Sequence, residues 1–220
     1  MRLVKPSFEI MKIMGFTERF SDFPVVANEA LELIEKAGRT CYKSEDKITE
    51  TSSRTFAQNI LKRGHESVIE HSAMTVKFVI DRGVSHELVR HRLCAFSQES
   101  TRYCNYKGGV TFVIPPWVNA IPGDYNQFLT GETESETHWL MAMLNLERIY
   151  KSLLEKNWSP QQARSVLPNS LKTEIVVTAN FREWRHIFRL RCSEAAHPQM
   201  REIMIPLRDK ARELVPIIFD

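Results

Sequence analysis

The sequence predicts an α+β fold in which a small, mostly antiparallel sheet packs against several helices. Apolar residues recur at helical spacing in long segments, whereas strand-like patterns are few and short. These segments do not alternate regularly between strand and helix, as a parallel βαβ sheet requires. A chain of 220 residues with 43% hydrophobic content can bury one sizeable core. We therefore expect a single domain over residues 1–220.

Helices are expected where apolar periodicity is bounded by start and stop signals. Asp22 and Pro24 begin the first helix, and Gly38 ends it. Gly64 ends the second helix, and Ser85 caps a short third one. The longest helix begins at residue 135. The predicted helices cover residues 22–38, 50–63, 85–92, 135–158, 159–167, 181–192 and 198–214.

Three strands are expected between these helices. Residues 74–80 have apolar side chains at every second position, which is the strand period. Residues 111–114 form a short strand that Pro115 and Pro116 end. Residues 173–179 form the third strand. The segment 117–134 is rich in turn residues, so we expect a long surface loop there.

Composition limits the possible functions. The net charge of +3 suits anionic small molecules and is weak evidence for nucleic acid. Charged residues interrupt the first twenty positions, so we expect no secretory signal, and no apolar run reaches the ~20 residues that span a bilayer. The four cysteines are widely spaced, so neither a zinc site nor a disulfide framework is indicated. We expect a cytoplasmic protein with reduced thiols.

Residues 90–103 contain the densest group of anion-binding side chains. Three arginines, a histidine, three serine or threonine hydroxyls and an amide lie in this short segment. A planar guanidinium can donate two parallel hydrogen bonds to one phosphate or carboxylate. The alternative is a solvated basic helix that turns into a polar loop, and the chemistry alone does not decide between the two.

Arginines occupy two faces of the last helix but one. Arg182, Arg185 and Arg189 share a polar stripe at i, i+3 and i+7. Arg191 lies on the other face with Trp184, which should look into the core. A buried arginine must be paired. Its partner is either a core carboxylate, in a structural ion pair, or a bound substrate.

Four sequence blocks, in order, resemble the signatures of the flavin-dependent thymidylate synthases. The best known of these signatures is R-H-R, seven residues, then S. The blocks are Gly64-His65-Glu66-Ser67 with Glu70-His71, Arg90-His91-Arg92 with Ser100, Ala163-Arg164-x-x-Leu167-Pro168, and Asn180-x-Arg182 with Leu190-Arg191.

This resemblance implies an activity: methylation of dUMP to dTMP, with 5,10-methylenetetrahydrofolate as carbon donor. FAD would be the cofactor and NADPH its reductant. The family binds both ligands at subunit interfaces of a homotetramer. We therefore expect self-association and dUMP as partners, but no nucleic acid, membrane or resident metal.

The resemblance also implies residue roles. Arg191 is the expected catalytic residue, because its guanidinium would stabilise negative charge on the pyrimidine; a pKa above ~12 makes it a poor general base. The expected flavin contacts are His65, Ser67, Arg90, His91, Arg92, Gln98, Asn180 and Arg182. The expected substrate contacts are Glu87, Arg90, Gln98, Glu99, Ser100, Thr101, Arg102, Arg164 and Arg191.

Some positions depart from the family pattern. Many relatives have serine at the position of Ala95, asparagine at that of Ser97 and an acidic residue at that of Gln98. Gln98 keeps an acceptor but loses the charge. His186 replaces an amide that helps to hold the flavin in some relatives, and its contact stays open.

The sequence gives less support to nucleophilic catalysis by serine or cysteine, to a metal site and to RNA binding. Ser100 lacks the Ser-His-Asp spacing that would activate a nucleophile. Histidines 65 and 71 do not fit H-E-x-x-H or its inverse, so a metal is not expected. Cysteines 94, 104 and 192 lie near the motifs, but the family gives them no role. A protein that binds RNA through the same arginines, with Tyr103, Tyr106 and Trp184 as stacking platforms, is the rival class.

Overall fold

The computed structural model describes residues 1–14, 23–127 and 130–220; of residues 23–28 it describes only the backbone. The predicted helix start at Asp22 lies outside the described residues, and the side chain of Pro24 is not described. The predicted α+β class is confirmed, with a four-stranded antiparallel sheet and a smaller mixed sheet. No helix in the described ranges is long and apolar enough to cross a membrane.

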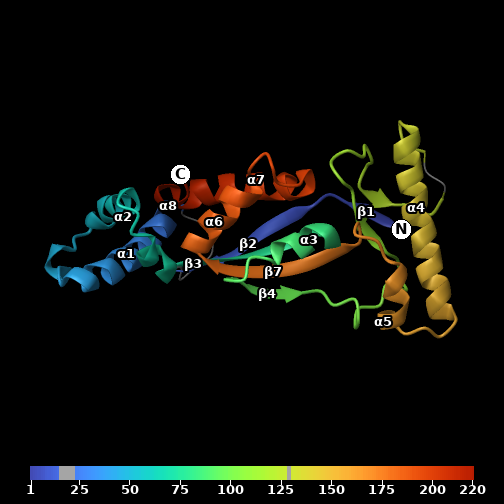
Figure 1. Ribbon diagram of the computed structural model, residues 1–220, viewed down its shortest axis with the longest axis horizontal. Coiled ribbons are helices and arrows are strands. Elements are labelled where there is room, and N and C mark those ends of the chain that lie inside the picture. Colours follow the sequence, from blue (N-terminus) through green and yellow to red (C-terminus); the bar gives the residue numbers. More distant parts are fainter. Residues whose placement is uncertain (15–22, 128–129) are drawn as a thin grey trace. The chain divides into compact units, whose positions relative to one another are not determined.

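Helices and strands follow one another along the chain as labelled in Figure 1. The helices are α1 (Phe23–Tyr42), α2 (Ser52–Lys62), α3 (Arg82–Leu88), α4 (Glu134–Glu155), α5 (Pro160–Ala163), α6 (Phe181–Arg191), α7 (Pro198–Leu214) and α8 (Pro216–Phe219), with 3-10 turns η1 (Glu45–Lys47), η2 (Glu66–His71) and η3 (Arg164–Val166). The strands are β1 (Arg2–Val4), β2 (Ser7–Ile13), β3 (Ala73–Asp81), β4 (Ala95–Gln98), β5 (Thr111–Val113), β6 (Gly123–Asp124) and β7 (Lys172–Asn180). The sheet orders are β5-β1-β6 and β2-β3-β7-β4.

The described residues form two compact units, each assembled from three chain segments. The first unit comprises residues 1–7, 78–90 and 96–176, and the second comprises residues 8–77, 91–95 and 177–220. Strands β3 and β7 contribute residues to both units. The prediction of one domain over the whole chain stays a prediction.

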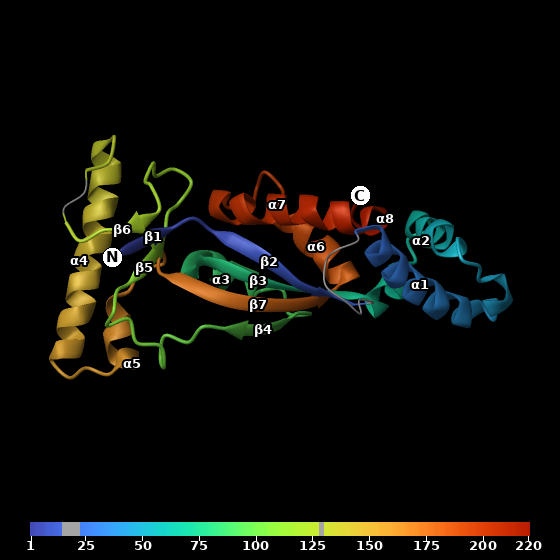
Figure 2. The same ribbon diagram turned by 180° about the vertical axis from the view of Figure 1, so that it is seen from behind.

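The core of the first unit lies between the small sheet and α4, which stand side by side in Figure 2. β1 pairs in parallel with β5, so that Leu3 faces Phe112, and both side chains are fully buried. α4 buries Tyr150 in the same cluster. Thr133 caps α4 through a capping box with Glu136, so the helix begins at Glu134, one residue before the predicted start.

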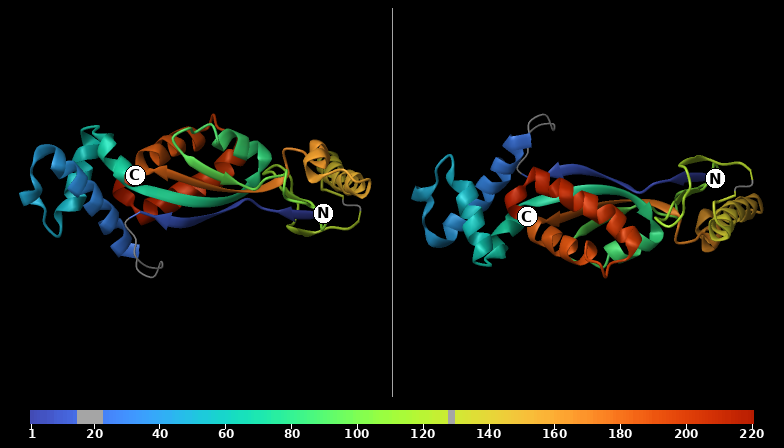
Figure 3. Two further views of the ribbon diagram at one scale, coloured as in Figure 1. Left: turned by 90° about the horizontal axis from the view of Figure 1, so that it is seen from below. Right: turned by 90° about the horizontal axis from the view of Figure 1, so that it is seen from above.

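The second unit is built on contacts of α6 with α7 and of α1 with α2, which Figure 3 shows from two sides. Trp184 of α6 is fully buried, and its indole N–H donates to the carbonyl of Met74 at 2.9 Å. The prediction that Gly38 ends the first helix is wrong, because α1 continues to Tyr42. A Cβ at Gly38 would lie 2.4 Å from the ring of Phe56 in α2. This glycine therefore permits close packing of two helices.

The short third helix also differs from its prediction. α3 begins at Arg82, because Asp81 caps it by accepting a hydrogen bond from the Val84 N–H at 2.8 Å. Ser85 lies inside the helix. The helix ends at Leu88, so Arg90, His91 and Arg92 follow it in an irregular segment.

The predicted strands are confirmed as β3, β5 and β7. Strands β1, β2, β4 and β6 were not predicted; β2 and β4 are the edge strands of the four-stranded sheet. In β2 only Ile10 and Ile13 are buried, so apolar alternation is weak there. The described residues between positions 117 and 133 form a long connection, as expected, with β6 as a two-residue strand inside it.

Candidate active site

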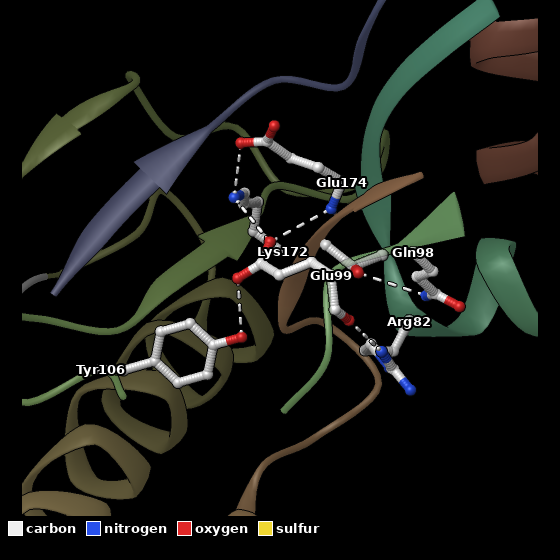
Figure 4. Close-up of polar contacts among 7 residues, drawn as sticks. Arg82, Gln98, Glu99, Tyr106, Lys172 and Glu174 are labelled. Atoms are coloured by element: carbon white, nitrogen blue, oxygen red, sulfur yellow. Dashed lines mark hydrogen bonds and ion pairs between the residues drawn. The ribbon is translucent and has the colours of Figure 1, made fainter. Parts of the chain in front are cut away.

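Hydrogen bonds of Glu99 hold the predicted substrate-binding segment against β7 in the first unit (Figure 4). Glu99 follows β4, and its backbone N–H donates to the carbonyl of Glu174 in β7 at 2.8 Å. Its carboxylate accepts hydrogen bonds from the Tyr106 hydroxyl at 2.8 Å and from Lys172 Nζ at 2.9 Å. A third bond comes from the backbone N–H of Glu174 at 3.2 Å. These contacts fix the start of the 100–104 turn.

Burial and hydrogen bonds to Glu99 shift the pKa values of Tyr106 and Lys172. Burial, followed by the hydrogen bond to Glu99, raises the pKa of Tyr106, so its hydroxyl stays a donor. Burial opposes protonation of Lys172, but its hydrogen bonds to Glu174 and Glu99 prevail and raise its pKa. The lysine is therefore a fixed cation between two carboxylates.

Gln98 and Glu99 have side chains that are already engaged within the first unit. Gln98 Nε2 donates to Ser85 Oγ at 2.9 Å and to Thr173 Oγ1 at 3.2 Å. Figure 4 shows Gln98 pointing away from Glu99. The structure therefore gives Gln98 a role in joining β4 to α3 and β7, while its predicted ligand contacts stay predictions.

The turn after Glu99 carries the hydroxyls and arginines expected to bind phosphate. Ser100 Oγ accepts a hydrogen bond from the Arg102 N–H at 3.3 Å. Arg164 Nη1 donates to Thr101 Oγ1 at 3.0 Å, so residues 63 positions apart meet here. The Arg102 side chain is exposed, with its guanidinium 5.6 Å from the Tyr103 ring centre. Glu87 and Arg90 belong to the same unit, at the end of α3 and just beyond it.

The predicted flavin residues Asn180 and Arg182 line a cavity of about 1010 Å³ in the second unit. Its walls combine five arginines with four carboxyl-bearing residues and several apolar side chains. The arginines are Arg182, Arg185, Arg189, Arg208 and Arg212, and the acidic residues are Glu66, Glu70, Glu183 and Asp220. Leu93, Phe188 and Phe219 supply apolar surface. Guanidinium groups and apolar side chains in one wall suit an anionic aromatic ligand.

Ion pairs orient the arginines of this wall. Arg182 lies 2.5 Å from a Glu70 oxygen, and Arg185 lies 3.3 Å from Glu66. Glu70, which follows the first sequence block, therefore pairs with α6. The Nε of Arg185 is buried and has no hydrogen-bond partner within the described residues. Such a donor requires an acceptor from a bound molecule or from water.

Arg191 is half-buried and is held by His91, a residue 100 positions earlier in the chain. Its Nε donates to His91 Nε2 at 3.0 Å. The other ring nitrogen, Nδ1, lies 3.4 Å from a carboxylate oxygen of Glu183. Burial of His91, followed by the charges of Arg191 and His186, lowers its pKa from 6.5 to about 4. At neutral pH the ring is therefore uncharged.

A second imidazole lies against the first. The rings of His91 and His186 meet edge to face at 5.8 Å, and the ligating atoms of His91, Glu183 and His186 lie within 4.8 Å of one another. However, His91 Nε2 accepts from Arg191, and His186 Nδ1 lies 3.0 Å from Arg189 Nη2. Guanidinium has no acceptor, so it takes a ring lone pair in each case. These contacts and the adjacent positive charges disfavour a cation.

The remaining predicted flavin residues are exposed. His65 precedes η2, Ser67 lies within it, and Arg92 follows His91. The structure therefore divides the predicted site residues between the units. The residues predicted to bind the phosphate lie in the first unit, together with the predicted flavin contacts Arg90 and Gln98. Arg191 and the remaining predicted flavin contacts lie in the second. Glu183 and Lys172 were not predicted as site residues, because neither belongs to the quoted motifs.

The low pKa of His91 predicts acid sensitivity of the fold. Between pH 6.5 and about 4 the unfolded chain binds a proton that the native imidazole does not. Stability should therefore fall as the pH falls through this window, by up to about 1.4 kcal/mol per pH unit from this residue. Urea unfolding between pH 4.5 and 7 measures the slope, which should be smaller in His91→Gln. Equal slopes would contradict the assignment.

The arginines of the cavity wall and the donors in the turn after Glu99 suit a protein that binds anionic ligands. The chain matches the family described as thymidylate synthase complementing protein over residues 25–217. A flavin-dependent thymidylate synthase from Corynebacterium efficiens is 33% identical over 98% of this chain and 89% of its own length. Another, from Geobacter sulfurreducens, is 35% identical over 83% and 78%. The chain therefore belongs to the thymidylate synthase complementing protein family, which confirms the resemblance seen in the motifs.

A solved structure shares the fold. The UMP/dUMP methylase PolB from Streptomyces cacaoi, bound with 5-Br dUMP, superposes with a TM-score of 0.72 over 100% of this chain and 95% of its own. The sequence identity is 22%. At that identity the likeness establishes the architecture, and the role of each residue has to be argued from the side chains of this chain.

Proposed function

We propose that this protein is a flavin-dependent thymidylate synthase that converts dUMP to dTMP, with 5,10-methylenetetrahydrofolate as carbon donor. Membership of the family and the names of the relatives support the activity. The observation that carries the residue assignment is the buried His91, which accepts a hydrogen bond from Arg191 Nε. Its neighbours Glu183 and His186 line the arginine-rich cavity. NADPH is proposed as the reductant and FAD as the cofactor.

The residues of the second unit suit a flavin dinucleotide. The cavity offers guanidinium groups for a pyrophosphate and apolar side chains for a ring system. Asn180 and Arg182 would hold the cofactor there, with His65, Ser67 and Arg92 as further contacts. When bound, the flavin supplies the hydride that reduces the transferred one-carbon unit.

The nucleotide is the proposed ligand of the 98–102 segment together with Arg164. Ser100, Thr101 and the guanidinium of Arg102 offer donors to a phosphate monoester. The contact of Glu99 with β7 holds this turn in place before the ligand arrives. Preorganised donors lose less conformational entropy on binding than mobile ones. Glu87, Arg90 and Gln98 are proposed as further contacts.

Arg191 is the proposed catalytic residue. A guanidinium facing N3 and O4 of the pyrimidine would stabilise the negative charge that develops there and make C5 more nucleophilic. The neutral imidazole of His91 accepts from Nε and so fixes the plane of the guanidinium. The chain thus contributes orientation and positive charge to the reaction.

Assembly as a homotetramer in the cytoplasm is part of the proposal. Several large apolar side chains are more than half exposed, among them Tyr103 at 79%, Leu93 at 77% and Ile121 at 77%. Leu93 also lines the cavity. Apolar side chains exposed near ligand-binding residues are typical of surfaces that pack against another subunit. Light scattering of the purified protein measures the assembly.

The cysteines are expected to be dispensable for turnover. Burial, followed by the charge of Glu183, raises the pKa of Cys94 to about 12, and burial also raises the pKa of Cys192. The attacking species in thiol catalysis is the thiolate, which both sites disfavour at neutral pH. Cys94→Ser and Cys192→Ala should therefore keep dTMP formation within a few-fold of wild type. Abolished turnover with full flavin content in either variant would refute this.

Anaerobic assay of the purified protein tests the proposed function. The protein should take up FAD, lose its yellow colour with NADPH, and form dTMP only when dUMP and 5,10-methylenetetrahydrofolate are both present. A colourless protein that binds neither FAD nor dUMP but retains RNA would favour the rival RNA-binding function.

A further inference from the structure

Glu183 is a buried carboxylate that the family motifs do not single out. It lies in the first turn of α6, and its side chain is 8% exposed. Its backbone N–H donates to the capping Asn180 Oδ1 at 2.8 Å. Its carboxylate faces His91 Nδ1 at 3.4 Å. A carboxylate removed from water is costly unless polar groups compensate it, so its position against this ring requires a reason.

The contacts of His91 determine which ring nitrogen carries the hydrogen. Arginine Nε always bears a hydrogen, so its contact with His91 Nε2 makes that nitrogen the acceptor. A neutral imidazole has one N–H, which must then lie on Nδ1. Nδ1 is the nitrogen that faces Glu183. The carboxylate and the guanidinium therefore select the same tautomer from opposite sides of the ring.

We propose that Glu183 is a positioning residue: it holds His91 in the tautomer whose Nε2 accepts from Arg191, and thereby sets the direction of the guanidinium. This inference rests on the proposed function, in which Arg191 faces dUMP. In the opposite tautomer an N–H on Nε2 would meet the N–H of Arg191. Two donors repel each other, so the guanidinium would turn out of its reactive position. Small displacements of such groups are costly in rate.

Two substitutions separate the hydrogen-bond acceptor from the charge. Glu183→Gln keeps an oxygen that can face Nδ1–H, whereas Glu183→Ala removes it. Nitrogen-15 NMR of the His91 ring at neutral pH reports the tautomer directly. The wild type and the glutamine variant should show the hydrogen on Nδ1, and the alanine variant should shift toward Nε2. The alanine variant should also lose about 10- to 100-fold in kcat/KM for dUMP, while glutamine stays close to wild type.

Two results would overturn the inference: an alanine variant with the wild-type tautomer, or glutamine and alanine variants that lose activity equally. If the alanine variant does not fold, Glu183→Asp withdraws the carboxylate by one methylene and keeps its charge at the start of α6. A wild-type tautomer and rate in that variant would also overturn it. If the wild-type protein forms no dTMP, the proposed function fails, while the NMR comparison still decides whether Glu183 controls His91.

Discussion

Arg191→Ala should lower the rate of dTMP formation by about 10²- to 10³-fold, the usual loss when one preorganised donor to a developing negative charge is removed. The fold and much of the bound flavin should remain, because the predicted flavin contacts belong to other residues. Binding of dUMP should weaken as well. Single-turnover kinetics with reduced flavin, together with anaerobic dUMP titration, measures these effects.

Two further variants define what Arg191 contributes. Arg191→Lys keeps a positive charge but loses both the planar fork and the Nε–H that His91 accepts, so it should resemble alanine more than wild type. Arg54→Ala is the matched control, because Arg54 is an exposed arginine on α2 of the same unit. Wild-type turnover in Arg191→Ala would remove this residue from the reaction.

Trp184→Ala should cost about 3–5 kcal/mol of unfolding free energy, the range for deleting a large aromatic side chain from a core. Trp184 is fully buried and packs against Phe188 with ring centres 5.6 Å apart. Trp184→Phe should cost less, since it keeps part of the packing and loses the hydrogen bond to Met74, worth about 1 kcal/mol. Urea or thermal unfolding measures both variants.

Trp158 provides the comparison for this substitution. It is the same residue type but is 45% exposed after α4. Trp158→Ala should change stability by about 0.5 kcal/mol or less, as surface substitutions usually do. A similar loss from both tryptophans would show that burial of Trp184 does not govern the stability of its unit.

Local sequence signals predicted most of the elements. α7 has its predicted limits, because Pro198 marks its start and the apolar period is regular. β3 and β7 could be predicted because alternate side chains are buried, which gives the sequence its two-residue period. The edge strands bury few side chains: β2 buries only Ile10 and Ile13, and β4 buries none fully. The packing of Gly38 against Phe56 depends on a second helix, so the glycine was misread as a stop.

The sequence motifs identified individual site residues but not which of their side chains contact one another. The motifs selected Arg191 and His91 separately, and the expected core position of Arg191 corresponds to a half-buried side chain at the edge of the core. Nothing in a sequence motif pairs side chains 100 positions apart. The roles of Glu183 toward His91 and of Lys172 toward Glu99 arise only when the chain has folded.

The ion pair between Glu99 and Lys172 is largely buried, so salt should affect it less than it affects exposed charges. The side chains of Glu99 and Lys172 are only 16% and 19% exposed, so dissolved ions screen their attraction much less than that of groups in open water. Arg102, by contrast, is exposed. Added salt should therefore weaken nucleotide capture by shielding the phosphate from the outer arginine, while the scaffold behind it keeps its shape. The dependence of dUMP affinity on salt concentration would then report mainly the contacts between the phosphate and exposed arginines. The buried Glu99–Lys172 pair would contribute little to it.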